Sequence, residues 1–306
     1  MTLSHITAVH PVPSLQQALS LWRDYPYPAA PVRRAERSGV NRLYTEFNRR
    51  KPHPLEPWIL ECRGLIKAYS GRRVVDRVSF AVGRGEIVGL LGRNGAGKTT
   101  SFRIAVGMVR PDGGDVVLKG ENVSREPMYR RAQRGMGYLS QENSVFVRMT
   151  VEENLLAILE VVGGRSRGER AARAAELMEQ FGLSRLARQE ARTLSGGERR
   201  KLEIARALIT SPAILLLDEP FSGVDPIAVQ DLQREILRLK NDSGLSILLT
   251  DHNVRETLAV TDRSYIIHEG RVLREGPPRE LVNDDLVKQT YLGDTFRGDE
   301  FDRTRR

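Results

Sequence analysis

The chain has 306 residues, enough for one large domain or two modest ones, and ample apolar content for a core. Its 48 lysines and arginines against 39 acidic residues give a formal net charge of +9, which suits nucleic acid, an anionic membrane face or simply an arginine-rich soluble protein. No stretch approaches the ~18–20 apolar residues of a membrane-spanning helix, and the N-terminus has no signal-peptide pattern. The single cysteine excludes an internal disulfide. We therefore expect a cytosolic protein with Cys62 buried in a strand as a small hydrophobe.

Residues 1–57 differ in composition from the rest of the chain. Eight prolines interrupt regular structure there, and the arginines at 33, 34, 37, 49 and 50 make the segment basic. We expect a mostly disordered extension with one short helix at 14–24. The functional alternative is a basic arm that touches membrane lipid or a partner; the other is a dispensable tail, or a start site placed too far upstream.

From Trp58 onward the pattern is that of a globular domain. In chain order we expect strands at 59–66, 74–82 and 86–91, a helix at 98–109, a strand at 115–118, a helix at 126–134 and a strand at 135–140. Helices follow at 150–161, 167–181 and 196–209, the first of them behind a capping box. The remainder is a strand at 213–217, a helix at 227–240, a strand at 246–249, a helix at 253–260, a hairpin of 263–268 and 271–274, and helical pieces from 278 to 291. This alternation predicts an α/β domain interrupted by a helical insert.

The stretch Gly92–Thr99 fits the phosphate-binding pattern G-x-x-x-x-G-K-[ST], with a predicted strand before it and a helix after it. Glycines let successive backbone N–H groups approach phosphate oxygens, and the helix start adds free N–H groups and its dipole. Lys98 can neutralise the β- and γ-phosphates, and the Thr99 hydroxyl can bind Mg²⁺. The alternative is a glycine-rich surface turn that matches by chance. The nucleotide-binding residues expected here are Gly92, Arg93, Asn94, Gly95, Ala96, Gly97, Lys98, Thr99 and Thr100.

Two carboxylates follow the apolar run of residues 214–217. Asp218, at the carboxyl end of a buried strand, is placed to hold Mg²⁺ near the phosphate loop. Glu219 is one residue further on, where it can polarise an attacking water as general base. The alternative is a strand that ends in ordinary exposed acids.

Ser195, Gly196 and Gly197 stand at the start of a predicted helix, with N–H groups free to bind a second anion. The plainer interpretation is an N-cap followed by glycines. Within Leu194–Glu198, however, these residues resemble the signature of ATP-binding-cassette (ABC) ATPases. That resemblance implies a P-loop NTPase of the ABC type, with a mixed β-sheet core, an inserted α-helical subdomain, and ATP and Mg²⁺ as ligands.

The resemblance also assigns roles outside these motifs. Gln141 matches the glutamine loop, which contacts Mg²⁺ and senses the γ-phosphate, and His252 matches the switch histidine, although a lone histidine is often structural. Asp225 ends the D-loop at 222–225, which lies across a dimer interface in this family. Tyr69 matches the aromatic side chain that stacks on adenine, although packing alone also explains a tyrosine there, and Val75 is expected beside the base.

Five stretches narrow the resemblance to the ATPase subunit of the lipopolysaccharide-export transporter. They are residues 71–75, 194–200, 219–226, 251–258 and 291–296. ATPases of branched-chain amino-acid importers are the nearest rival. Three positions depart from the family pattern: Arg93 and Ser140 each replace a usual proline, and Val147 replaces an expected basic residue. The first two should leave ATP chemistry intact, whereas Val147 lies on the surface expected to meet membrane subunits.

The resemblance covers residues 58–296, with a helical subdomain at about 146–192 and a charged tail at 297–306. It implies a homodimer that sandwiches two ATP molecules, bound to two transmembrane permease subunits on the cytoplasmic face of the inner membrane. Phe146 and Arg148 are the expected groove for a permease helix. A soluble ABC protein acting on ribosomes or DNA is disfavoured, because the chain has one cassette and no long coiled-coil or zinc insert. A regulator without turnover is disfavoured by the presence of both Glu219 and His252.

Overall fold

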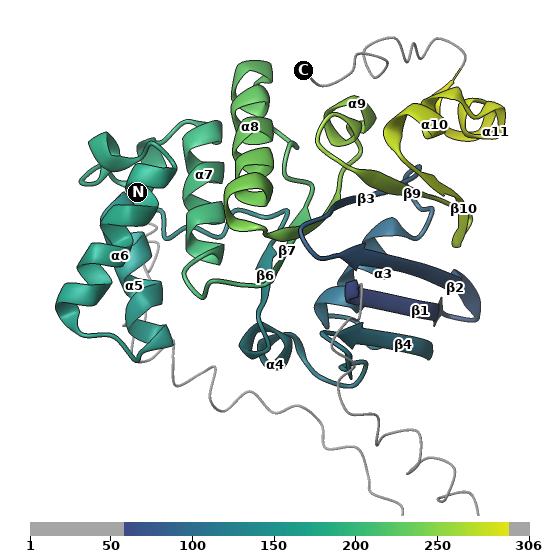
Figure 1. Cartoon of the computed structure of the whole chain (residues 1–306), viewed down its shortest axis with the longest axis horizontal. Helices are drawn as coiled ribbons and strands as arrows, with labels where there is room; N and C mark the ends of the chain where they lie inside the picture. The colour runs from purple at the N-terminus through teal and green to yellow at the C-terminus, as the bar shows by residue number, and fades with distance from the viewer. Residues whose placement is uncertain (1–57, 294–306) are drawn as a thin grey trace, which may run out of the picture. The chain divides into compact units, whose positions relative to one another are not determined.

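The computed structural model describes residues 58–293, all of which belong to one compact unit, Pro52–Arg306. The predictions for 1–57 and 297–306 fall outside the described residues. Two β-sheets organise this unit (Figure 1). One is antiparallel, in the order β2-β1-β4-β5, and the other has the order β10-β9-β3-β8-β7-β6. The sequence pattern predicted the strands but did not separate them into two sheets.

The antiparallel sheet comes from the start of the domain. Its strands are β1 (Trp58–Tyr69), β2 (Arg72–Gly83), β4 (Gly113–Leu118) and β5 (Glu121–Asn122). Cys62 lies in β1 as a buried free thiol, as expected. Burial raises the pKa of that thiol far above its usual range. The cysteine therefore acts as a small core residue and has no nucleophilic character.

The six-stranded sheet is parallel from β9 through β6, with β10 antiparallel at one edge. Its strands are β3 (Ile87–Leu91), β6 (Met136–Leu139), β7 (Ile214–Asp218), β8 (Ser246–Thr250), β9 (Arg263–His268) and β10 (Arg271–Gly276). Every residue of β3, β7 and β8 is buried. Such strands need apolar side chains on both faces, which explains their continuous apolar runs.

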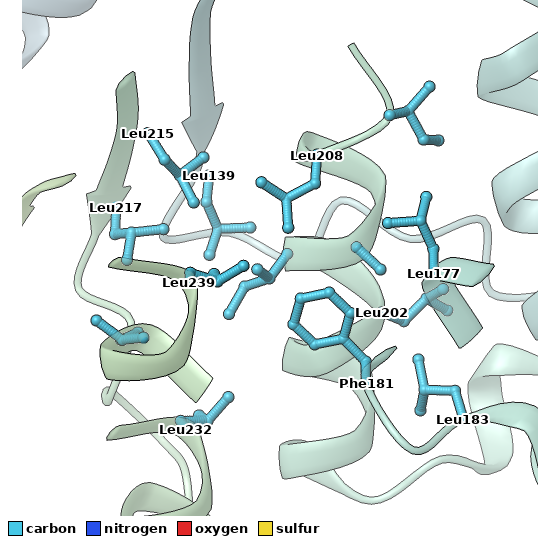
Figure 2. Close-up of a cluster of buried hydrophobic side chains, with 14 of the residues drawn as sticks. Leu139, Leu177, Phe181, Leu183, Leu202, Leu208, Leu215, Leu217, Leu232 and Leu239 are labelled. Carbon is cyan, nitrogen blue, oxygen red and sulfur yellow. The ribbon is translucent and has the colours of Figure 1, made fainter. Parts of the chain in front are cut away.

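Alternate side chains of β7 enter two different cores. Leu215 and Leu217 pack with the helices of residues 151–243, whereas Ile214 and Leu216 pack toward the antiparallel sheet and the helix that follows the glycine loop. Figure 2 shows the first core, in which Leu215 and Leu217 face Phe181 and Leu202 from the helices. Fully burying each of these side chains contributes about 1.5–3 kcal/mol. The sheet is therefore fixed from both sides, and its strand ends form a rigid platform.

Helices complete the domain, and their caps follow from the sequence. They are α3 (Lys98–Val106), α4 (Met128–Gln133), α5 (Val151–Val162), α6 (Arg167–Gln180), α7 (Gly196–Ala207), α8 (Pro226–Ser243), α9 (Val254–Leu258), α10 (Pro278–Asn283) and α11 (Asp285–Val287). Short turns are η1 (Ser184–Leu186), η2 (Ala191–Thr193) and η3 (Lys288–Leu292). The first helix ends three residues before the predicted 109, because Gly107 caps it in the left-handed region at φ 92°.

The helical insert joins β6 to β7. The predicted capping box between Thr150 and Glu153 is present and starts α5, and a second box between Ser166 and Glu169 starts α6. Figure 1 shows α5, α6 and α7 together on one side of β6 and β7, away from the antiparallel sheet. No helix in residues 58–293 is both long and apolar enough to cross a bilayer.

Candidate functional site

The glycine loop between β3 and α3 has a backbone that only glycine can supply. Gly92 and Gly97 have φ angles of 148° and 102°. A Cβ on Gly92 would lie 2.1 Å from the Ile267 carbonyl oxygen, and one on Gly97 would lie 2.5 Å from that of Val74. Either contact is far inside van der Waals range, so a side chain is excluded at Gly92 and at Gly97. A loop of this shape lets backbone N–H groups approach phosphate oxygens closely.

Lys98 folds back over this loop at the N-terminus of α3. Its Nζ donates to the Gly92 carbonyl and, at 3.3 Å, to the Arg93 carbonyl. Burial lowers the pKa of Lys98, while the carboxylates of Glu219 and Asp251 raise it. Neutral carbonyls are weaker acceptors than a charged oxyanion. An anion at the loop would therefore compete well for this ammonium group.

Asp218 and Glu219 stand at the carboxyl end of β7. Asp218 is buried, and its Oδ1 has no hydrogen-bond partner among residues 58–293. Burial raises the pKa of Asp218, with Arg103 and Arg200 opposing the shift. A buried carboxylate oxygen without a partner is uncommon and suits a cation ligand. Glu219 has φ 48°, an unfavourable conformation for a side-chain-bearing residue, so its position is fixed at a conformational cost.

Gln141 and His252 converge on one oxygen of Glu219. Gln141 Nε2 donates to Glu219 Oε2 at 2.8 Å, and His252 Nδ1 lies 3.4 Å from the same atom. These side chains come from three strand ends, since Gln141 follows β6, Glu219 follows β7 and His252 follows β8. The adjacency of those strands in the sheet brings together the three residues that the resemblance to ABC ATPases had placed at one site.

The two residues expected beside the adenine, Tyr69 and Val75, differ in exposure. Tyr69 is 48% exposed at the end of β1, with Lys67 Nζ 5.5 Å from its ring centroid. Val75 is fully buried in β2, where it pairs with Lys67. The Val74 carbonyl contacts the position of Gly97, so β2 runs directly beside the loop. Tyr69 can offer a ring face to a base, whereas Val75 offers no surface in this conformation.

Ser195, Gly196 and Gly197 lie elsewhere. Ser195 caps α7, and its hydroxyl donates to Glu198 Oε2 at 2.8 Å while it accepts the Glu198 N–H at 3.3 Å. A Cβ on Gly197 would lie 2.6 Å from Ala228 Cβ, so glycine permits close packing of α7 against α8. Within the part of the chain that the structure describes, no hydrogen bond or ion pair joins residues 195–197 to the loop at 92–100. The two segments that the sequence predicts to bind anions are thus not joined by polar contacts within this part of one chain.

Asp225 has a clear local contact. Its Oδ1 accepts the Ala228 N–H at 3.0 Å, which caps α8 ahead of Pro226. This cap positions the loop at 222–225 whatever else the carboxylate does.

Sequence reasoning missed Arg200, which holds the backbone under the acidic pair. The guanidinium is buried and donates to the carbonyls of Asp218 at 3.0 Å and Glu219 at 3.2 Å. It also donates to the Ser140 carbonyl at 2.9 Å and pairs with the buried Glu203. An arginine and a glutamate three residues apart on the apolar face of a helix were the available signal. Asp251, a second buried carboxylate at this edge, was also missed.

Comparison with known proteins identifies the family. The family model described as ABC transporter matches residues 75–222. The lipopolysaccharide export system ATP-binding protein LptB of Escherichia coli strain K12 is 52% identical over 238 residues, which span 78% of this chain and 98% of that protein. LptB of Haemophilus influenzae is also 52% identical, over 239 residues spanning 78% of this chain and 99% of its own length.

The chain belongs to the ABC transporter ATP-binding proteins. The crystal structure of MJ1267 in its ADP conformation, an ATP-binding cassette of an ABC transporter, covers 78% of this chain and 99% of its own length, with a TM-score of 0.70 and 28% identity. The predicted P-loop fold of the ABC type is therefore confirmed. This ABC cassette binds nucleotide and is an ATPase.

Proposed function

We propose that this ABC ATPase powers a lipopolysaccharide exporter. The observation that supports this most is the 52% identity to E. coli LptB across 98% of that protein. The five stretches recognised in the sequence, from residue 71 to 296, point to the same subfamily. An ATPase of a branched-chain amino-acid importer is the alternative, and a soluble protein acting on nucleic acid is a more distant one.

The loop and Lys98 would hold the ATP phosphates, with Tyr69 against the adenine and Val75 behind it. The side chains of Thr99, Gln141 and Asp218 are suited to Mg²⁺, which supplies charge neutralisation at the β- and γ-phosphates when bound. The unpartnered Oδ1 of Asp218 supports this assignment. Among residues 58–293, no group of three or more His, Cys, Asp or Glu side chains is arranged so that it could hold a metal ion. A Mg²⁺ site built from one carboxylate, a hydroxyl, an amide and substrate oxygens fits that composition.

Glu219 would act as the general base. Its carboxylate would accept a proton from the water that attacks the γ-phosphorus, while ADP departs. The contacts from Gln141 and His252 to Glu219 Oε2 orient that carboxylate. Lys98 and the loop N–H groups would stabilise the charge that moves onto the leaving phosphate.

We propose that the working unit is a homodimer with two ATP molecules. Gly196 and Gly197 lie in the first turn of α7, where a helix leaves N–H groups without an intrahelical acceptor. Among the described residues no hydrogen bond or ion pair joins 195–197 to the loop of their own chain, which supports a role toward a second copy. Each ATP would then lie between the loop of one copy and residues 195–197 of the other, with Asp225 near the interface. Closing on ATP and opening after hydrolysis would drive the attached permeases.

Phe146 and Arg148 are proposed to form a groove that receives a helix of a transmembrane permease subunit, on the cytoplasmic face of the inner membrane. The dimer would thus bind two permease subunits. Phe146 is 38% exposed, and the guanidinium carbon of Arg206 lies 4.7 Å from its ring centroid. The aromatic ring is thus held in one orientation at the surface by a cation–π contact. A fixed, exposed aromatic residue is typical of a contact hot spot.

Affinity purification from detergent-solubilised membranes tests the substrate class. Permeases of the lipopolysaccharide-export type should co-purify with the chain; amino-acid permeases, or ribosomes in place of membranes, would overturn the proposal. Phe146→Ala should weaken that co-purification while basal ATP hydrolysis is retained. Leu286→Ala is the matched control, because Leu286 is equally exposed, at 38%, on α11. Equal recovery of permeases with both variants would remove Phe146 from the contact.

A further inference from the structure

A second buried carboxylate lies beside the proposed general base. Asp251 directly follows β8 and is fully buried, with no role assigned to it in the chemistry described above. Burial raises the pKa of Asp251, so the surroundings must compensate the carboxylate if it is to remain ionised. Its hydrogen bonds show where that compensation comes from.

Two backbone N–H groups from different segments donate to Asp251. Phe221 N donates to Oδ2 at 3.0 Å, and Asn253 N donates to Oδ1 at 2.9 Å. Phe221 belongs to the turn between Glu219 and the loop at 222–225, whereas Asn253 belongs to the loop that carries His252. The Asp251 carboxylate therefore links the turn that follows Glu219 to the loop that carries His252.

His252 completes the arrangement. Its Nδ1 lies 3.5 Å from Asp251 Oδ1 and 3.4 Å from Glu219 Oε2, so this nitrogen faces two carboxylates. Two acceptors favour a proton on Nδ1. The Nε2 atom is then left as the acceptor on the half-exposed side of the ring. A carboxylate that fixes the tautomer of a neighbouring histidine is a recurring device in enzyme sites.

We propose that Asp251 is a positioning residue for ATP hydrolysis, which holds His252 in its Nδ1–H tautomer and locks the His252 loop to the turn that follows Glu219. The inference rests on the proposed roles of Glu219 and His252.

The substitution Asp251→Asn tests this with little change in shape. Three donors face the carboxylate, namely the N–H groups of Phe221 and Asn253 and the Nδ1 side of His252. An amide has one acceptor oxygen and adds an NH₂ group of its own, so at least one donor must lose its partner. We expect kcat for ATP hydrolysis to fall about 10-fold or more, with ATP affinity changed less than about 3-fold.

A double-mutant cycle separates positioning from general damage. If Asp251 acts through His252, then Asp251→Asn combined with His252→Ala should hydrolyse ATP within about 2-fold of His252→Ala alone. Losses that multiply would overturn the proposal. Asp262→Asn is the matched control, because Asp262 also accepts a backbone N–H, from Ile87 at 2.8 Å. Asp262 directly precedes β9 and so lies at the amino ends of the parallel strands, away from the proposed site. Its kcat should match the wild type.

A measurement on the unmodified chain covers the case in which Asp251→Asn folds poorly. The ¹⁵N chemical shifts of the His252 ring should report the Nδ1–H tautomer at neutral to alkaline pH, and the Nε2–H tautomer would overturn the inference. The proposed roles fail separately: wild-type turnover by Glu219→Gln would reject the general base. Normal loss in Glu219→Gln together with wild-type kcat in Asp251→Asn would reject only the positioning role.

Discussion

The polar groups at the two ends of the parallel strands in the six-stranded sheet differ in how well they are paired. At the amino ends, Arg263 meets Glu86 at 2.9 Å and Glu275 at 2.7 Å, and also donates to the Ala81 carbonyl at 3.1 Å. Asp262 accepts the Ile87 N–H and pairs with Lys240. Each of these charges has a partner of opposite sign, so the charges at the amino ends of the strands are neutralised by other residues of the same chain.

At the carboxyl ends the polar groups are left poorly matched. Within the described part of the chain, Asp218 Oδ1 has no hydrogen-bond partner and Lys98 donates only to neutral carbonyls. Glu219 has a left-handed backbone conformation. Such arrangements cost stability and persist at sites that bind ligands. The charge pairs at the amino ends of the strands therefore stabilise the sheet, whereas the polar groups at the carboxyl ends are available for ligand binding and chemistry.

The largest expected effect on ATP turnover comes from a substitution at the carboxyl end of β7. Glu219→Gln keeps the side-chain size but removes the proposed base, and should lower ATP turnover by ~100-fold or more. Phosphate release at saturating ATP measures this, and the free energy of unfolding in urea should stay within about 1 kcal/mol of the wild type. A variant that hydrolyses ATP near the wild-type rate would remove Glu219 as the base.

A substitution at the amino ends of the strands should instead lower the stability of the protein and leave its turnover unchanged. Arg263→Met retains an unbranched side chain but leaves Glu86 and Glu275 without their cation, and should lower the free energy of unfolding by about 2 kcal/mol. Urea denaturation checks this loss. The kcat of the folded fraction should be unchanged, because no contact of Arg263 reaches the loop or the acidic pair. A loss of kcat at unchanged stability would contradict the view that the amino ends of the strands contribute stability and the carboxyl ends contribute catalysis.

Much of the site was predictable because its signals are local. The glycine spacing of 92–97 and the apolar run of 214–217 each dictate their own structure within a few residues. The convergence of Gln141, Glu219 and His252 was implied by the resemblance to ABC ATPases, and the structure gives its physical reason, since parallel neighbouring strands place their carboxyl ends together.

The parts that were missed depend on contacts between distant segments. Asp251 accepts from Phe221, thirty residues earlier in the chain, and Arg200 reaches the Asp218 carbonyl, eighteen residues later. In the sequence each looks like one more charge in a basic or acidic stretch. Likewise, nothing in the patterning of 58–118 separates an antiparallel sheet from the central one, because strand period does not fix strand partners.

The loop at 92–100 is proposed to be half of a site that a second copy completes. The most direct test is the solution mass of the Glu219→Gln protein, by size-exclusion chromatography with light scattering, with and without ATP. We predict a monomer without nucleotide and a dimer with ATP. A monomer at saturating ATP, or a monomeric wild-type chain that turns over ATP at full rate, would contradict the account.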